Sequence, residues 1–201
     1  MYGRLAHRRR PIFRFFPWFL LCAGLVVLLV WVAGNRRFLR LLFSPRSDYD
    51  AMIDVAAERH DVDPRLLKAL VWKESGFDAN AVGSRGEIGL TQLRMEHGAV
   101  AEWASARGEP PPPKGVLFRP EINLDIGAWY LSRALRHWEG FDRQYELALS
   151  EYNAGRTGMS PWIPESPDGE VLSNITIQST KEYVRAVMER YRLYVAEREA
   201  E

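Results

Sequence analysis

The sequence predicts an all-α domain, or one with minimal β structure, preceded by a single transmembrane helix. Residues 15–34 form a run of twenty residues without a charge, and from residue 47 onward apolar residues recur at helical spacing. We find no convincing alternation of polar and apolar residues of the kind that marks a half-exposed strand. A chain of 201 residues accommodates one compact domain and an appendage. We therefore divide it into a basic N-terminus with the anchor and a juxtamembrane linker, residues 1–46, and a helical domain, residues 47–201.

Charge is distributed unevenly between these two parts. The first 46 residues hold nine Arg and no Asp or Glu, which leaves 18 basic and 26 acidic residues in the other 155, a formal charge of −8. An acidic domain argues against a nucleic-acid partner, because phosphate binding requires a basic face. The single cysteine, Cys22, excludes an intrachain disulfide, and the four histidines lack the spacing of metal ligands. We expect no metal and no other cofactor.

The apolar segment from Phe15 to Gly34 is long enough to cross a bilayer, since about twenty helical residues span the hydrocarbon core. Trp18 and Trp31 fall near its ends, where aromatic residues gather in membrane proteins. A cleaved signal peptide has a shorter apolar core, so we expect an uncleaved anchor, with cleavage next to Ala33 as the alternative. Five Arg precede the segment and four follow it, a weak bias that places the domain on the extracytoplasmic (periplasmic) side.

Two helices are expected at the start of the domain. The first has apolar residues at positions i, i+3, i+4 and i+7 and ends near His60. The second begins with Asp63 as N-cap and Pro64 at the first helical position. It runs to about Ser75 and stops at Gly76, which places a carboxylate, Glu74, at its C-terminal end.

The rest of the domain is expected to contain four more helices. A turn-rich stretch with three glycines comes first, and helical patterning then resumes from Leu90 to Arg107. Prolines at 110–113 form a stiff polyproline connector. The next helices are expected from Pro120 to just before Gly140, from Tyr145 to Gly155, and after a capping box formed by Ser179 and Glu182.

Glu74 is the residue on which the predicted chemistry depends. Glycoside cleavage needs a proton donor at the leaving oxygen and a group that stabilises the oxocarbenium-like sugar. A Glu at a helix end beside Trp72 and Phe77 is expected to have a raised pKa and to stay protonated near neutral pH. Taken alone this is a weak inference, because a Glu at a helix C-terminus is usually solvated. An amide in a glycine-framed turn, Gln92, and a Tyr-Asn pair at 152–153 strengthen it.

Most of the domain resembles the lytic transglycosylases of the soluble-transglycosylase type, which have a lysozyme-like fold and cut peptidoglycan. Five elements in the family's order carry the resemblance: Glu74-Ser75-Gly76-Phe77; Gly86-Glu87-Ile88-Gly89-Leu90-Thr91-Gln92-Leu93; Pro120-Glu121-Ile122-Asn123-Leu124 with Gly127 and Tyr130-Leu131; Glu151-Tyr152-Asn153-Ala154-Gly155; and Tyr183-Val184. The second element is usually written Gly-Leu-Met-Gln, so Thr91 replaces Met here. Any one element alone is a weak signal, whereas five in the right order are specific.

The resemblance implies a reaction with a single catalytic carboxylate and no cofactor. Glu74 would protonate the glycosidic oxygen between N-acetylmuramic acid and N-acetylglucosamine, and would then take the proton of the muramyl C6 hydroxyl as that hydroxyl attacks C1. The product is a 1,6-anhydro sugar. The implied partners are peptidoglycan glycan strands, together with the lipid bilayer through the N-terminal helix. The residues expected to contact the glycan are Ser75, Ser84, Glu87, Gln92, Tyr152, Asn153 and Tyr183.

Two positions depart from the family pattern. The family usually has a Ser nine residues after the catalytic Glu; this chain has Gly83 there, and we expect Ser84 to substitute for it through a small loop shift. Glu87 stands where the family commonly has Ala, and goose-type lysozymes, which resemble this fold, carry an acidic residue at about that place. A second carboxylate could hold a water and permit hydrolysis, although Glu87 could equally be a solvated turn residue or pair with Arg85. A lysozyme-type hydrolase that uses Glu74 and Glu87, and a non-catalytic glycan-binding scaffold, stay open as alternatives.

Overall fold

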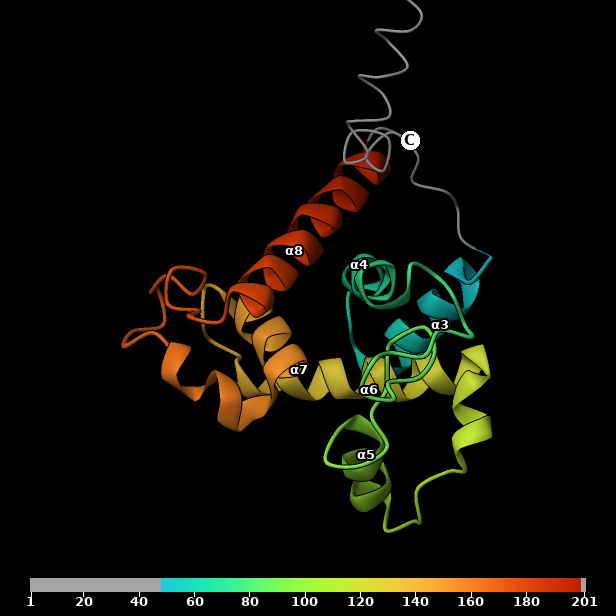
Figure 1. The fold of residues 1–201 in the computed structure, drawn as a ribbon. Helices are drawn as coiled ribbons and strands as arrows, with labels where there is room; N and C mark the ends of the chain where they lie inside the picture. The colour runs from blue at the N-terminus through green and yellow to red at the C-terminus, as the bar shows by residue number, and fades with distance from the viewer. Residues whose placement is uncertain (1–47, 200–201) are drawn as a thin grey trace, which may run out of the picture. The chain divides into compact units, whose positions relative to one another are not determined.

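The computed structural model describes residues 48–199, so the predicted transmembrane segment at 15–34 lies outside the described residues. Among these residues no helix is long and apolar enough to span a membrane. The β structure of these residues consists of isolated bridges, which pair Ile88 with Val82 and with Leu93. The helices are α3 (Asp50–His60), α4 (Pro64–Ser75), α5 (Ala99–Arg107), η1 (Lys114–Phe118, 3-10), α6 (Pro120–His137), α7 (Gln144–Met159), η2 (Ser160–Trp162, 3-10) and α8 (Gln178–Glu199) (Figure 1). The all-α prediction is confirmed for the domain.

Helix α4 begins and ends as predicted. Asp63 caps its N-terminus by accepting a hydrogen bond of 2.9 Å from the backbone N–H of Arg65. At the other end Gly76 adopts a left-handed φ of 62°, and its N–H donates to the carbonyl of Trp72. These two local signals fix the length of the helix and leave Glu74 in its last turn.

Helix α6 lies at the centre of the domain, where it contacts α3, α5 and α7, while α8 packs against α4 and α7 (Figure 1). A large buried cluster of apolar residues joins α3, α4, α6, α7 and α8. A smaller cluster joins α5, η1 and another part of α6 to the loop that holds Ile88 and Leu93. Tyr152 of α7 packs against both clusters, so this side chain lies where the two meet.

The helix predicted for residues 90–107 is wrong in its first half, because only α5 is helical. Before α5 the chain turns: the backbones of Ile88 and Leu93 exchange two hydrogen bonds of 3.0 Å, and Gln92 has a positive φ of 48°. A residue in this conformation does not continue a right-handed helix. Leu90 and Leu93 are buried by the fold of the loop. Their spacing in the sequence is therefore the same as on the buried face of a helix, although the backbone is not helical.

The last two helices differ from prediction at their ends. Helix α7 continues to Met159 past a break at Gly155, where φ is 74° and ψ is 157°. Helix α8 begins at Gln178, so Ser179 lies within its first turn and the predicted capping box is wrong. The side chain of Glu182 instead accepts a 2.7 Å hydrogen bond from the amide of Gln178.

Candidate active site

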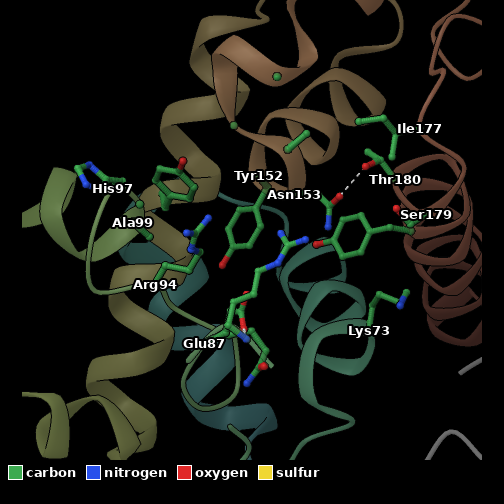
Figure 2. A pocket seen from close by; sticks show the side chains of 18 residues that line it. Lys73, Glu87, Arg94, His97, Ala99, Tyr152, Asn153, Ile177, Ser179 and Thr180 are labelled. Carbon is green, nitrogen blue, oxygen red and sulfur yellow. Dashed lines mark hydrogen bonds between the residues drawn. The ribbon is translucent and has the colours of Figure 1, made fainter. Parts of the chain in front are cut away.

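A polar cleft of about 610 Å³ is lined by residues from the end of α4, the loop before α5, α6, α7 and the start of α8 (Figure 2). The predicted contact residues that line it are Glu87, Gln92, Tyr152, Asn153 and Tyr183. Glu74 is not itself a lining residue, but its carboxyl is hydrogen-bonded to one. The fold therefore gathers at one cleft residues that are up to about a hundred positions apart in the sequence.

Glu74 is half-buried, and its Oε1 accepts a hydrogen bond of 2.7 Å from the hydroxyl of Tyr183 on α8. Burial raises the pKa of the Glu74 carboxyl from 4.5 to about 7, and the negative charge of Glu87 acts in the same direction. The hydrogen bond from Tyr183 and the positive charge of Lys73 oppose this rise without cancelling it. A carboxyl with this pKa is present in both protonated and ionised forms near neutral pH, as general acid–base catalysis requires.

Buried hydrogen bonds to α6 and α7 hold the loop that carries Gln92. The Oδ1 of Asn123 on α6 accepts 2.8 Å bonds from both the backbone N–H and the hydroxyl of Thr91, and its Nδ2 donates to two further backbone carbonyls at 2.8 Å. From α7, the hydroxyl of Tyr152 donates to the carbonyl of Thr91 at 2.9 Å. Gln92 is thus positioned by two helices from distant parts of the sequence.

Gly127 permits the close contact between this loop and α6. A Cβ at position 127 would lie 2.5 Å from the hydroxyl oxygen of Thr91, so a larger residue would push the loop away. Thr91, which stands where the family has Met, is fully buried and makes this structural contact rather than lining the cleft. Asn123 and Gly127 of α6 therefore hold this loop at the cleft.

Helices α7 and α8 are joined at the cleft by a hydrogen bond between side chains. The hydroxyl of Thr180 donates to Oδ1 of Asn153 at 2.9 Å, drawn as a dashed line in Figure 2. The ring of Tyr152 packs edge-on against the ring of Tyr130, with 5.3 Å between centroids. These contacts fix the orientation of the Tyr-Asn pair at the cleft.

Ser75 and Ser84 do not line the cleft. The hydroxyl of Ser75 donates to the carbonyl of Leu90 at 2.9 Å, which ties the end of α4 to the loop. Ser84 is exposed on its turn and is not a lining residue. Trp72 was expected to help bury the Glu74 carboxyl. Its ring contacts the guanidinium of Arg190, which lies 4.1 Å from the ring centroid.

Several lining residues were not identified from the sequence: Lys73, Arg85, Arg94 and Thr180. In Figure 2, Lys73 and Arg94 lie on either side of Tyr152. The helix predicted for residues 90–107 gave no reason to single out Arg94. The position of Lys73 directly before Glu74 could have indicated that residue. Among residues 48–199 no group of three or more His, Cys, Asp or Glu side chains is arranged to hold a metal ion.

Comparison with known proteins places this site in a family. The sequence profile of the transglycosylase SLT domain matches residues 51–171, more than half of the chain. The membrane-bound lytic murein transglycosylase C of Edwardsiella ictaluri (strain 93-146) is 30% identical over 149 residues, which are 71% of this chain and 41% of that protein. This chain therefore spans less than half the length of that relative.

Two solved structures share the fold. An inactive mutant of the lytic transglycosylase Slt from Pseudomonas aeruginosa superposes with a TM-score of 0.66 at 23% identity, over 76% of this chain and 25% of that one. The 70 kDa soluble lytic transglycosylase from Escherichia coli gives a TM-score of 0.60 at 20% identity, over 73% and 24%. The matched range of the family profile includes Glu74, Gln92 and the Tyr-Asn pair, and it ends before α8. The chain belongs to the transglycosylase SLT domain family.

Proposed function

We propose that this protein is a membrane-anchored peptidoglycan lytic transglycosylase that cleaves the β-1,4 bond between N-acetylmuramic acid and N-acetylglucosamine. The observation that carries the proposal is the Glu74 carboxyl, whose pKa of about 7 and hydrogen bond to Tyr183 suit a group that gives and takes a proton beside a polar cleft. Membership of the SLT family and the printed name of the Edwardsiella relative support the reaction class.

In the proposed reaction one carboxyl group performs both proton transfers. Protonated Glu74 donates its proton to the glycosidic oxygen as the bond from that oxygen to C1 of the muramyl residue breaks. The Glu74 carboxylate then accepts the proton of the muramyl C6 hydroxyl, whose oxygen forms the new bond to C1. The product carries a 1,6-anhydro ring, no water is consumed, and Glu74 ends protonated. The hydroxyl of Tyr183 stabilises the ionised form of Glu74 between the two steps.

We assign the contacts that hold the sugar to Gln92, Tyr152 and Asn153. All three line the cleft, and each is fixed by a hydrogen bond: Gln92 to the carbonyl of Gly89 at 2.9 Å, and the Tyr-Asn pair through Thr91 and Thr180. Prepositioned polar groups lower the entropy lost when the substrate is oriented.

Product analysis tests the proposal. The purified protein is incubated with peptidoglycan, and the released fragments are analysed by mass spectrometry. We expect muramyl ends that are lighter by one water than hydrolysed ends, which identifies the anhydro ring. Glu74→Gln should reduce the rate at least about 100-fold, because general acid catalysis is lost, while circular dichroism shows an unchanged fold. Cleavage by Glu74→Gln at the wild-type rate would show that the site is misassigned, and binding without cleavage by the wild type would favour the scaffold alternative.

A lysozyme-type hydrolase is the second candidate, because a second carboxylate, Glu87, lines the same cleft. In that reaction Glu87 would hold a water that attacks C1, and the products would have ordinary reducing ends. Predominantly reducing-end products that disappear in Glu87→Ala would establish hydrolysis. Anhydro ends in both the wild type and Glu87→Ala would exclude it.

We also propose that the apolar segment at residues 15–34 anchors the protein in the cytoplasmic membrane, with the domain on the periplasmic side. The length of the segment and its flanking Arg residues support this, as does the membrane-bound relative. The full chain should be recovered in the membrane fraction, and a periplasm-dependent reporter fused after Glu201 should be active. A soluble protein that begins near Asn35 would instead identify the segment as a signal peptide.

A further inference from the structure

Gly83 is crowded although its backbone is ordinary. A Cβ at this position would contact the carboxylate oxygen Oε2 of Glu87, and would lie 2.7 Å from Oε1 of Gln92 and 3.0 Å from Cβ of Glu87. Gly86 and Gly89 differ, because their φ values of 81° and 74° favour glycine whatever the space. Gly83 has no positive φ, so the neighbouring side chains, and not the backbone conformation, would crowd a side chain added there.

The Glu87 side chain is folded back over this turn and held by one hydrogen bond, while backbone bonds close the turn itself. Its Oε2 accepts a 2.9 Å bond from the backbone N–H of Arg85, so the pairing with Arg85 involves the backbone amide. The N–H of Gly83 donates to the carbonyl of Glu87 at 2.8 Å, and the N–H of Gly86 donates to the carbonyl of Gly83 at 3.0 Å. Glu87 therefore lines the cleft in a defined position, not as a freely solvated turn residue.

The Glu87 and Gln92 side chains converge on the space above Gly83. Gln92 is held from its other side, where Nε2 donates to the carbonyls of Gly89 at 2.9 Å and Ala81 at 3.4 Å. Removing the Glu87 side chain would open space into which the Gln92 amide can move. Adding a side chain at position 83 would push both groups out of place.

We propose that Gly83 and Glu87 form a coupled pair, in which the Glu87 carboxylate fills the space of a side chain at position 83 and acts as a positioning residue for Gln92 in the cleft. The inference rests on the proposed function for its effect on cleavage, but the pairing itself does not.

A double-mutant cycle on stability tests the pairing without any assay of activity. Gly83→Ala should lower the melting temperature of the full chain by about 2 °C, because the added methyl displaces the end of the Glu87 side chain and crowds its Cβ. In the Glu87→Ala background the same change should shift it by less than about 1 °C. Gly115→Ala is the matched control, since a Cβ there meets nothing within 4 Å and the residue does not line the cleft. Equal shifts from Gly83→Ala in the two backgrounds would overturn the pairing.

Kinetics of peptidoglycan cleavage test the positioning role. Glu87→Ala should raise KM several-fold because Gln92 loses its neighbour, and Gly83→Ala should add no further loss in that background. Glu87→Gln keeps the shape, so its KM should lie clearly below that of Glu87→Ala. A wild-type KM for Glu87→Ala would overturn the positioning role.

The pH profile separates the charge of Glu87 from its shape. Glu87→Gln removes the negative charge that helps to raise the pKa of Glu74, so the alkaline limb of kcat/KM should move to lower pH. The other groups that act on Glu74, namely Lys73, Tyr152 and Tyr183, are unchanged. An unmoved limb would show that the charge of Glu87 does not reach Glu74. If no variant and no wild type cleaves peptidoglycan, the proposed function fails, whereas the stability cycle still decides the pairing.

Discussion

A single residue, Glu74, links the chemistry of the cleft to the stability of the fold. Its pKa is about 7 in the folded protein against an ordinary value of 4.5, so the folded state holds the proton more tightly than the unfolded state. The contribution of this group to stability is therefore largest below about pH 4.5 and is lost as the pH rises to about 7. Above that pH both states are ionised, and the burial of the charge costs up to about 3 kcal/mol.

Because the ionised Glu74 carboxylate destabilises the folded state, Glu74→Gln should stabilise the protein in a pH-dependent manner. At about pH 8 the neutral amide avoids the cost of burying a charge, so the free energy of unfolding should rise by up to about 3 kcal/mol over the wild type. At about pH 4 the wild-type carboxyl is protonated, and the difference should be small. Urea unfolding at both pH values measures this. Glu58→Gln, at an exposed position of α3, is the control and should show little difference at either pH. The same gain for Glu74→Gln at both pH values would contradict the account of a buried carboxyl.

The hydroxyl of Tyr183 should set the pH at which the proposed cleavage activity falls. It donates a hydrogen bond to the Glu74 carboxyl and so favours the ionised form. In Tyr183→Phe that bond is lost, the pKa of Glu74 rises, and the alkaline limb of kcat/KM should move to higher pH. Tyr145→Phe, a core position outside the cleft, should leave the limb unchanged. A limb that moves to lower pH in Tyr183→Phe would show that the hydroxyl does not act on Glu74.

At the scale of the elements, the break in α7 depends on one glycine. Gly155 has φ 74° and ψ 157°, a region that is nearly closed to other residues. Because a Cβ there meets nothing within 4 Å, Gly155→Ala should cost about 1–3 kcal/mol in unfolding free energy from backbone strain alone. Gly158→Ala is the matched control: its Cβ would be 3.6 Å from that of Ala154, an ordinary contact, and helix propensity favours Ala by up to about 1 kcal/mol. Equal effects of the two substitutions on chemical denaturation would refute the strain argument.

The elements that could be predicted are those with local signals at their ends. Asp63 and Gly76 fix α4 from within a few residues, so both its ends were predicted. The local sequence of the loop before α5 has the apolar spacing of a helix, and this spacing led to the wrong prediction. The shape of the loop depends instead on Asn123, which lies 32 residues beyond Thr91 and cannot be recognised from a local pattern. The capping motif at Ser179 also gave a wrong start for α8. The helix begins at Gln178, earlier than this local motif indicates.

The candidate site was found only in part for the same reason. The hydrogen bond from Tyr183 joins residues 109 positions apart, and no spacing rule predicts it. The family resemblance identified Tyr183 as a candidate together with Gln92 and the Tyr-Asn pair. It relates distant motifs of the chain to one site, which the residues of a single sequence do not do. It did not indicate Arg94 or Thr180, which line the cleft. It also did not show that Ser75 would be engaged by the carbonyl of Leu90.

At the scale of the whole molecule, the cleft is more basic than the domain that contains it. Residues 47–201 carry a formal charge of −8, yet the cleft is lined by Lys73, Arg85 and Arg94 against a single carboxylate, Glu87. Peptidoglycan, the proposed substrate, bears carboxylates on its peptide stems, so these cations should attract it, while the acidic remainder of the domain repels it. The attraction acts between exposed charges and is screened by salt.

Binding should therefore be sensitive to ionic strength in a way that depends on these cations. The KM for peptidoglycan should rise several-fold between about 0.02 M and about 0.5 M salt, because the Debye length falls below the distances across an open cleft. Arg94→Ala should raise KM at low salt and weaken this dependence, since one of the attracting charges is gone. Arg185→Ala removes an exposed charge of α8 outside the cleft lining and should leave both properties unchanged. Equal salt dependence in the wild type and Arg94→Ala would show that the charge of Arg94 does not attract the substrate, and that binding relies on the neutral contacts of Gln92 and Asn153 instead.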